Sequence, residues 1–270
     1  MKRRKFIQGA CCSVLGVSAG VSTAKVPKQK KTHVITLSFD DGLKKSFYKI
    51  ADIYERFELR ACLNVIATGH LPKFYPTVRG QPDSGIVPFK KGDFEDWNKL
   101  KSRGHEVMAH SYDHVDLTKI AFNEAKELIS KCVDYFEAHL QGFKASQSVY
   151  NFAYNASTPE LDEYALTKFL AIRTQGDTPI NPIPTTKKPV RVGCWSHGPD
   201  NIDGFLEKEI NTFLDSPGGW FVFNAHGLDD EGWGPMSSKY LTSLLMRLTK
   251  IDQLAILPTG EVVLQLGTFG

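Results

Sequence analysis

The stretch "TLSFDDG" places two acids, Asp40 and Asp41, where an apolar segment ends and a glycine begins. Burying an unpaired carboxylate is costly, and a cation beside the pair would offset that cost and depress the pKa of both carboxyls. Neighbouring residues that leave a strand point in different directions, so one acid can bind a metal while the other acts on the attacking water. The alternative, an aspartate that caps the helix expected after Gly42, accounts for only one of the two acids.

Two histidines offer the nitrogen ligands that such a cation needs. His110 and His114, in "HSYDH", are four residues apart, and on a helical turn this spacing would point both imidazoles the same way. A carboxylate from elsewhere would complete a facial triad with open positions, which suits a divalent cation, and zinc is the ion we predict. The alternative is two surface or core histidines that share this spacing by chance.

A third histidine, His226, follows the apolar run "FVFNA" and precedes a stretch rich in glycine and acids. After an apolar strand a histidine is commonly a hydrogen-bonded core residue, but this composition favours a loop at the rim of the fold. At the far side of the attacking water, His226 would serve as the general acid for a leaving group.

The elements that must position these residues alternate along the chain between apolar strands and amphipathic helices. Strands are expected at 33–39, 60–67, 105–110, 148–154, 169–174, 220–226 and 254–258, and helices at 43–57, 94–102, 122–139, 202–214 and 237–250. Between them lie a long irregular insertion, 69–92, and a proline-rich loop, 177–189. This order implies parallel pairing, as a barrel or an open doubly wound sheet, with functional groups at the carboxyl ends of the strands.

Composition and charge narrow the function classes. The chain has 270 residues and is 41% hydrophobic, which is ordinary for a globular protein. Four of its 33 basic residues lie at positions 2–5, and without them 29 basic residues face 30 acidic ones. This near-neutral balance argues against nucleic acid or an anionic membrane as a partner.

The first 24 residues resemble an export signal. They combine a basic start, a weakly apolar stretch of small residues and a small-x-small ending, and "RRKFIQ" resembles a twin-arginine signal. The segment is too short and too weakly apolar to span a bilayer stably, so we predict an exported protein, periplasmic or extracellular. An amphipathic basic helix and a lipid anchor at Cys11 or Cys12 are the less favoured alternatives.

A polar linker, 25–32, then leads into one domain, 33–270, with no internal repeat. The remaining cysteines, Cys62, Cys132 and Cys194, are odd in number and widely spaced. They form neither a disulfide framework nor a metal knuckle, and we expect them to be buried as small apolar residues.

Three motifs in this order, "TLSFDDG", "RGHEVMAHSYDH" and "FVFNAHG", resemble those of the polysaccharide deacetylase family, the chitin-deacetylase-like carbohydrate esterases with a NodB homology domain. The resemblance runs from about residue 34 to 262. It implies a single-domain α/β fold, a distorted barrel of seven or eight parallel strands with surrounding helices.

The resemblance also implies a role for each motif residue. Asp40 matches the catalytic base and Asp41 the metal-binding aspartate, His110 and His114 match the histidine ligands, and His226 matches the general acid. The implied reaction is hydrolysis of an N-acetyl or O-acetyl group on a polysaccharide or oligosaccharide, assisted by a divalent ion.

One motif departs from the family pattern. Family members often carry an Arg-Pro-Pro-Tyr-Gly-like sequence, whose arginine is braced against the catalytic aspartate, where this chain reads "YNFAYNAS". Residues 153–157 lack that arginine and both prolines. The chain also shows no clear equivalent of the acid that binds this arginine; "GCWSHG" around Trp195 could replace it, or Trp195 could simply pack.

Aromatic residues near the motifs are candidates for contact with a sugar ring, because an aromatic face suits the apolar side of a pyranose. They are Trp233, Tyr154 and Tyr112. For Trp233 and Tyr112 the alternative is a buried anchor of the loop.

The sequence therefore predicts an exported, metal-dependent deacetylase whose partner is an acetylated glycan. A glycan-binding protein that has lost catalysis is an alternative, motivated by the altered "NFAYNAS" motif. A hydrolase of a small cyclic amide is another. The sequence carries no information on the oligomeric state.

Overall fold

The computed structural model describes residues 31–78, 80–186, 188 and 190–265. The predicted export signal, 1–24, and all but the last two residues of the predicted linker lie outside the described residues.

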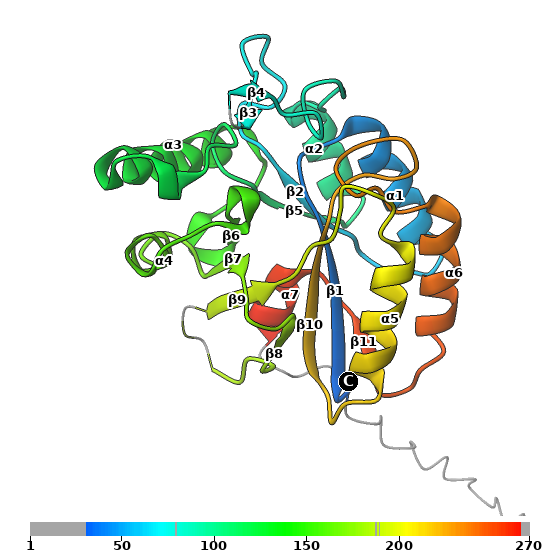
Figure 1. Cartoon of the computed structure of the whole chain (residues 1–270). Coiled ribbons are helices and arrows are strands. Elements are labelled where there is room, and N and C mark those ends of the chain that lie inside the picture. The colour runs from blue at the N-terminus through cyan, green and yellow to red at the C-terminus, as the bar shows by residue number, and fades with distance from the viewer. Residues whose placement is uncertain (1–30, 79, 187, 189, 266–270) are drawn as a thin grey trace, which may run out of the picture.

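Within the described residues, seven parallel strands form a nearly closed barrel (Figure 1). In spatial order the strands are β10 (Gly219–Ala225), β1 (His33–Phe39), β2 (Cys62–Val65), β5 (Glu106–Ala109), β6 (Val149–Asn151), β7 (Ala171–Gln175) and β9 (Val190–Cys194). A parallel bridge between Trp195 and Phe223 brings the end of β9 back to β10. The α/β barrel expected from the sequence and from the family resemblance is confirmed, in a single domain.

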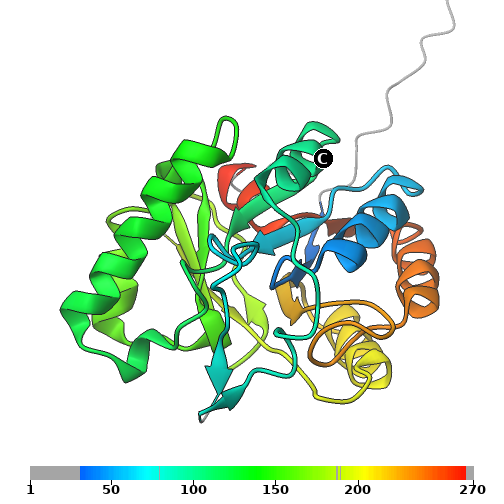
Figure 2. The same ribbon diagram turned by 90° about the horizontal axis from the view of Figure 1, so that it is seen from above.

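Helices surround this barrel (Figure 2). They are α1 (Lys44–Glu55), α2 (Phe94–Ser102), α3 (Phe122–His139), α4 (Pro159–Leu166), α5 (Asp203–Leu214), α6 (Ser238–Leu248) and the short α7 (Thr259–Gln265). Helices α3 and α4 lie on one side, and α1, α5 and α6 lie on the other. In α1, Phe47, Ile50 and Tyr54 recur at helical spacing and are buried, so this helix covers the strands with one apolar face.

Short elements complete the fold. Strand β11 (Leu254–Ile256) pairs with β1, and β8 (Ile180–Asn181) pairs antiparallel with β10. The insertion 69–92 contains a two-stranded hairpin, β3 (Thr77–Val78) and β4 (Gln81–Pro82). Three 3₁₀ turns are η1 (Leu117–Lys119), η2 (Ala145–Gln147) and η3 (Ala153–Asn155).

The structure corrects several predicted elements. The strand expected at 148–154 ends at Asn151 and turns into η3, whereas β9, α4 and α7 were not predicted. Strand β9, "VRVGC", has an exposed arginine and a glycine that hide its apolar pattern. Helix α4 begins with a proline at its first position, which the sequence interpretation did not use as a helix start.

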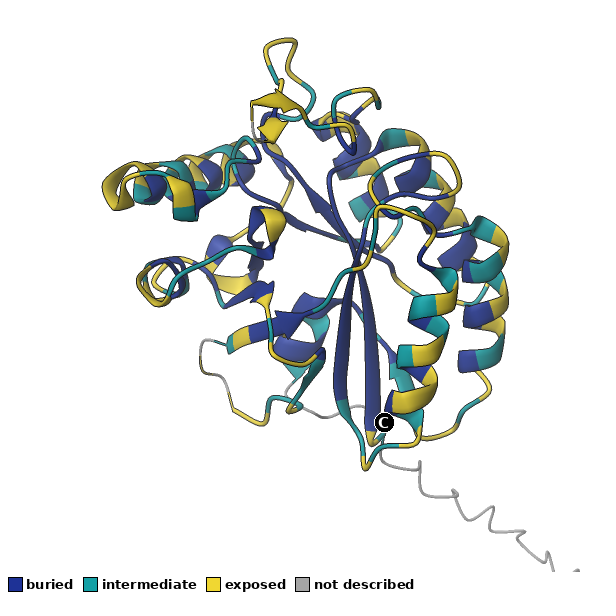
Figure 3. Cartoon of the chain, in the orientation of Figure 1, coloured by how far each residue is buried: buried dark blue, intermediate teal, exposed yellow. Residues whose placement is uncertain are grey.

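Burial follows the layers: the barrel strands are largely buried, the β3–β4 hairpin is exposed, and the helices are exposed along their outer faces (Figure 3). Cys62, Cys132 and Cys194 are free and buried, as expected. Among the described residues, no helix is both long enough and apolar enough to cross a membrane.

Candidate active site

The acid pair lies at the carboxyl end of β1. Asp40 and Asp41 are both 2% exposed, and Asp41 has a backbone φ of +77°, followed by Gly42 at +66°. The helix that follows has Leu43 at its N-cap, with no side-chain capping hydrogen bond. Neither aspartate is therefore a helix cap, and the alternative interpretation of the pair is wrong.

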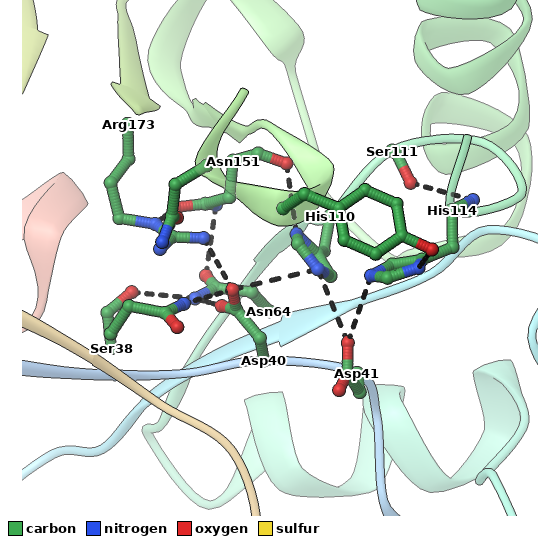
Figure 4. A network of polar contacts seen from close by, with 12 residues as sticks. Ser38, Asp40, Asp41, Asn64, His110, Ser111, His114, Asn151 and Arg173 are labelled. Carbon is green, nitrogen blue, oxygen red and sulfur yellow. Dashed lines mark hydrogen bonds and ion pairs between the residues drawn. The ribbon is translucent and has the colours of Figure 1, made fainter. Parts of the chain in front are cut away.

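The two histidines lie opposite Asp41, although not on a helical turn as we predicted. His110 follows β5 directly, and the chain then loops through two positive-φ residues, Ser111 at 63° and His114 at 59°. Ser111 Oγ accepts a hydrogen bond from the backbone N–H of His114 at 3.0 Å, which holds this loop closed (Figure 4). The loop, rather than helical spacing, makes the two imidazoles converge.

The geometry of Asp41, His110 and His114 fits a metal ion. Asp41 Oδ1 lies 3.3 Å from His110 Nε2 and 3.4 Å from His114 Nε2, and three potential ligand atoms, one from each residue, lie within 4.8 Å of one another. Asp41 Oδ1 is buried and accepts no hydrogen bond within the described part of the chain. A buried carboxylate oxygen without a donor is costly unless a cation satisfies it, and one carboxylate with two imidazoles suits zinc or a similar divalent ion.

Hydrogen bonds fix which nitrogen of each histidine faces Asp41. His110 Nδ1 lies 3.0 Å from the backbone oxygen of Asn151, and His114 Nδ1 lies 3.1 Å from the hydroxyl of Tyr154. Because a backbone carbonyl only accepts, Nδ1 of His110 carries the proton and Nε2 is left free as a ligand.

Asp40 is held by a different set of partners. Its Oδ2 accepts hydrogen bonds from Arg173 Nη2 at 2.6 Å and from Asn224 Nδ2, and its Oδ1 accepts one from Asn64 Nδ2 at 2.7 Å. Arg173 is fully buried. A carboxylate offers about four acceptor positions, so these contacts orient Asp40 and leave one position for a proton. Figure 4 shows Arg173 and Asn64 converging on Asp40.

The family pattern places an arginine on the strand that corresponds to β6. In this chain the arginine that contacts Asp40 is Arg173, on the neighbouring strand β7. Arg173 Nε donates to Asn151 on β6, and its Nη1 donates to Asn155, both at 2.7 Å. Asn151 and Arg173 are paired in the register of these strands. The missing arginine is therefore supplied from elsewhere, and Asn151 occupies the β6 side of the contact.

Trp195 does not replace the missing acid. Its indole N–H donates to the backbone oxygen of Gly176 at 3.0 Å, and its ring packs against the core. The side chain that meets the guanidinium near this position is the thiol of Cys194, whose Sγ lies 3.4 Å from Arg173 Nη1. The packing alternative for Trp195 is the one the structure supports.

Our sequence interpretation missed the whole network around Asp40. Its members are buried polar residues of the barrel strands: Asn64, Asn151, Arg173 and Asn224. An arginine in "FLAIRT" is the signal that was available, because an arginine in a buried strand needs a buried acid.

A cavity of about 540 Å³ opens above these residues. Asp40, Asp41, His110 and His114 line it, and so do His226 and Trp233. The ring centres of His226 and Trp233 are 5.4 Å apart in an edge-to-face arrangement. The structure thus brings the predicted ligands, base and general acid to one cavity.

The predicted aromatic residues divide into two groups. Tyr154 and Trp233 line this cavity and are 40% and 37% exposed. A Cβ at Gly198 would lie 2.8 Å from the indole of Trp233, so this glycine lets the backbone pack against the ring. Tyr112 is not among the residues lining the cavity; it packs against the core and contacts Tyr135 edge to face.

Tyr154 links the site to the insertion. Its hydroxyl donates to Asp83 Oδ2 at 3.3 Å, so it must accept from His114 Nδ1–H and leaves His114 Nε2 free on the metal side. Asp83 follows β4 directly. The sequence interpretation did not select Asp83, because nothing local connects it with a histidine at position 114.

Backbone strain concentrates at this site. Of the seven described non-glycine residues with positive φ, five belong to it: Asp41, Ser111, His114, Tyr154 and Asn155. Such conformations cost about 1–3 kcal/mol each and persist where the surroundings hold them, commonly at functional sites.

The electrostatics of the site differ from residue to residue. Burial raises the pKa of Asp41, but the nearby His110 and His114 outweigh it and hold this pKa well below the ordinary value. Burial lowers the pKa of His110, while Asp40 and Asp41 more than reverse that effect, so its pKa is raised. For His226, burial prevails over both aspartates and the pKa is lowered.

A parallel barrel whose strand ends carry an aspartate pair, two converging histidines and a third histidine defines a hydrolase-type site. The profile of the polysaccharide deacetylase family matches residues 27–165, just over half of the chain, and the chain belongs to that family. This family comprises carbohydrate deacetylases and esterases, as the resemblance implied. None of the curated proteins compared with the chain matches it.

Solved structures share the fold. A Mycobacterium smegmatis protein described as a polysaccharide deacetylase is 12% identical with a TM-score of 0.65, covering 88% of this chain and 91% of its own. The Xyl-CE4 domain of a multidomain xylanase from the hindgut metagenome of Trinervitermes trinervoides is 13% identical (TM-score 0.55; 89% and 93% covered). A family 4 carbohydrate esterase from Streptomyces lividans, solved with acetate, is 13% identical (TM-score 0.53; 84% and 92% covered).

Proposed function

We propose that this protein is a metal-dependent hydrolase that removes acetyl groups from a glycan outside the cytoplasm. One observation carries the proposal: the buried, unpartnered Oδ1 of Asp41 faces two imidazole Nε2 atoms, with a second oriented carboxylate, Asp40, beside it. The location rests on the export signal predicted at residues 1–24, which lie outside the described residues.

Asp41, His110 and His114 would hold the ion, most simply zinc. A bound divalent cation supplies Lewis-acid chemistry, polarising the acetyl carbonyl and making water a stronger acid. The lowered pKa of Asp41 keeps this ligand ionised, as metal binding requires.

Asp40 is placed to act as the general base. Arg173, Asn64 and Asn224 orient its carboxylate, and it lines the cavity in which the acetyl group would lie. In the reaction, Asp40 takes a proton from the attacking water, a bond forms between that oxygen and the acetyl carbon, and the bond to the sugar nitrogen or oxygen breaks. Acetate is one product.

His226 would give the proton that the departing amine or hydroxyl needs. It lines the same cavity as Asp40, and its lowered pKa makes the protonated imidazole a stronger acid. Typical general acid–base catalysis contributes about 10²–10⁴-fold to the rate.

Acetate release tests the proposal. We expect release from chitooligosaccharides or acetylated xylan, loss of release after a chelator, and recovery when zinc is added back. Turnover that survives complete removal of metal, verified by elemental analysis, would contradict the metal dependence.

A glycan-binding protein without catalysis is the second candidate, and one structural relative supports keeping it. A mutant of BA3943, described as a CE4 family pseudoenzyme with restored activity, shares the fold at 14% identity and a TM-score of 0.52. The absence of the family's arginine and prolines at residues 153–157 motivated this alternative. Arg173, however, provides an arginine contact to Asp40. Glycan binding without any acetate release would favour it over the hydrolase.

The other alternative, hydrolysis of a small cyclic amide, has less support. Exposed rings of Tyr154 and Trp233 at the cavity suit a sugar polymer better than a small molecule that is enclosed on all sides.

A further inference from the structure

The loop 227–236, which follows His226, carries three consecutive acids that the proposed reaction does not use. The first two form exposed ion pairs with lysines of α1, both at 2.7 Å: Asp229 with Lys49, and Asp230 with Lys45. Because solvent and salt screen such exposed pairs, these two contacts hold the loop only weakly.

The third acid, Glu231, is 7% exposed and meets the first turn of α1. Its Oε2 accepts hydrogen bonds from the backbone N–H of Ser46 at 2.8 Å and from the Ser46 hydroxyl at 2.5 Å. Ser46 Oγ in turn accepts from the backbone N–H of Leu228 at 2.9 Å. The first N–H groups of a helix lack partners within the helix, and a carboxylate beside them is favourable. Glu231 therefore caps α1 from a distant part of the chain and ties the loop to this helix.

This junction lies between the two halves of the site. Helix α1 begins shortly after Asp41, and the loop begins directly after His226. A Cβ at Gly232 would lie 2.8 Å from Leu43 Cδ1 and 3.3 Å from His226 Cβ. The residue that follows Glu231 is therefore packed between the start of α1 and the proposed general acid.

The imidazole of His226 depends on this loop for its orientation. Strands β1 and β10 are paired up to Phe39 and Ala225, so the sheet fixes the backbone only as far as the residue before His226. Among the described residues, no hydrogen bond holds the imidazole itself. Its ring instead packs edge to face against Trp233, two residues after Glu231, with the ring centres 5.4 Å apart. A contact that holds the loop therefore also holds this ring.

We propose that Glu231 is a positioning residue for His226: by capping α1 it holds the loop 227–236, and through the loop it keeps the imidazole directed at the leaving group. The inference rests on the proposed function, in which His226 protonates the departing amine or hydroxyl. Glu231 is not among the described residues that line the cavity, so it acts through His226. A misplacement of about 1 Å can lower a rate by about 10²-fold, which sets the size of the expected effect.

Substrates with different leaving groups test this role. An amine or a sugar hydroxyl needs a proton as its bond to the acetyl carbon breaks, whereas para-nitrophenolate leaves para-nitrophenyl acetate without one. In zinc-loaded Glu231→Met, we expect kcat to fall by about 10- to 100-fold on the acetylated oligosaccharide that the wild type hydrolyses, and hardly at all on para-nitrophenyl acetate. KM and zinc content should stay near the wild-type values. Glu231→Gln keeps a neutral acceptor for the Ser46 N–H and should recover part of the loss.

Two comparisons separate this role from a general weakening of the fold. Asp230→Asn removes the neighbouring exposed acid of the same loop and should match the wild type on both substrates. In a His226→Ala background, Glu231→Met should cause no further loss, because the effects of residues that act as one unit do not add. If Glu231→Met does not fold, Ser46→Ala removes the hydroxyl that joins Glu231 to Leu228 and should give the same selective loss, smaller in size.

Hydrogen exchange provides a readout that does not depend on turnover. Peptides covering the loop 227–236 should exchange faster in Glu231→Met than in the wild type or in Asp230→Asn, while peptides from α3 should not change. Three results would overturn the proposal: equal losses on both substrates, a further loss in the His226→Ala background, or unchanged exchange of the loop. If the wild type hydrolyses neither substrate, the proposed function fails. Faster exchange of the loop would then still support its attachment by Glu231, and unchanged exchange would contradict it.

Discussion

Buried or partly buried acids lie at both the amino and the carboxyl ends of the barrel strands. The two ends differ in how the carboxylate oxygens are paired and in which direction the pKa is shifted. Glu106, the first residue of β5, has both carboxylate oxygens paired: Oε1 accepts from the backbone N–H of Gly260 at 3.0 Å, and Oε2 accepts from that of Glu261 at 3.1 Å. Burial nevertheless raises the pKa of Glu106 to about 7. This acid connects β5 to the start of α7.

At the carboxyl end, Asp41 shows the reverse combination. One of its oxygens has no hydrogen-bond donor among the described residues, and yet its pKa is held well below the ordinary value. An acid with all its oxygens paired and a raised pKa is explained by structure alone. His110 and His114 keep Asp41 ionised, and its oxygen without a donor beside two imidazole nitrogens is an arrangement that a cation would complete, so we place the proposed function at the carboxyl end.

The strongest test of this difference removes the charge of the proposed base. Asp40→Asn should lower kcat by about 10²–10⁴-fold, because an amide cannot take the proton from water. Metal content, measured by elemental analysis, should stay at the wild-type level, since Asp41, His110 and His114 are intact. His110→Ala is the counterpart and should lose the metal.

Glu106→Gln serves as the control at the other end and should keep kcat near the wild-type value. If Asp40→Asn turns over at the wild-type rate, or if Glu106→Gln loses activity as severely, the functional distinction between the two ends is wrong.

The next effect concerns stability. Arg173→Met leaves Asp40 buried without its cation, and breaking a buried ion pair from one side costs about 3–5 kcal/mol. The matched control is Arg247→Met, because Arg247 pairs with Glu207 at 2.8 Å while the two side chains are 39% and 38% exposed. Exposed pairs contribute about 0–1 kcal/mol.

Urea unfolding measures both free energies. Equal losses for the two variants would contradict the prediction, because the buried Arg173–Asp40 pair would then stabilise the fold no more than an exposed pair does.

Much of the fold could be predicted from the sequence, because the local pattern was strong. Helix α3 begins and ends at the residues expected, Phe122 and His139. Its apolar positions repeat at helical spacing over five turns, and its neighbours do not interrupt the pattern. Strand β9 was missed because a short strand with an exposed arginine gives no clear alternation.

For the site, sequence motifs predicted which residues meet but not how they are held. Asp41, His110 and His114 come together, yet through positive-φ loops instead of the helical turn expected. Arg173 was missed because its partner Asp40 is 133 positions away, and pairing at such separation leaves no local pattern. Register between strands decides this contact, and register depends on the whole barrel.

A smaller effect should follow from the link between the metal ligand His114 and the insertion. Tyr154→Phe removes the hydroxyl that accepts from His114 Nδ1 and donates to Asp83. Loss of a group that orients a metal ligand typically weakens binding by about 10–100-fold. Zinc affinity, measured by competition with a chromophoric chelator, gives a readout that does not depend on turnover.

Tyr164→Phe is the matched control, because the Tyr164 hydroxyl meets Ser130 at 2.9 Å, away from the cavity. Zinc affinity should be unchanged there. Equal affinity in wild type and Tyr154→Phe would show that His114 is positioned by its loop alone.

The smallest expected effect concerns Glu106, at the amino end of β5. The pKa of Glu106 is about 7 in the folded protein against an ordinary 4.5, so the folded state binds this proton more tightly than the unfolded state. The resulting stabilisation is complete below the unfolded value and is lost as the pH rises from about 4.5 to 7.

Glu106→Gln lacks this titration. The melting temperature of wild type minus that of Glu106→Gln should therefore fall across this interval, by about 2–4 °C if the partly exposed carboxyl contributes roughly 1 kcal/mol. Taking the difference between two proteins cancels the titration of the metal site, which both share. A difference that stays flat, or that grows with pH, would mean that the hydrogen bonds from α7 keep Glu106 ionised, and the two ends of the barrel would then treat their acids alike.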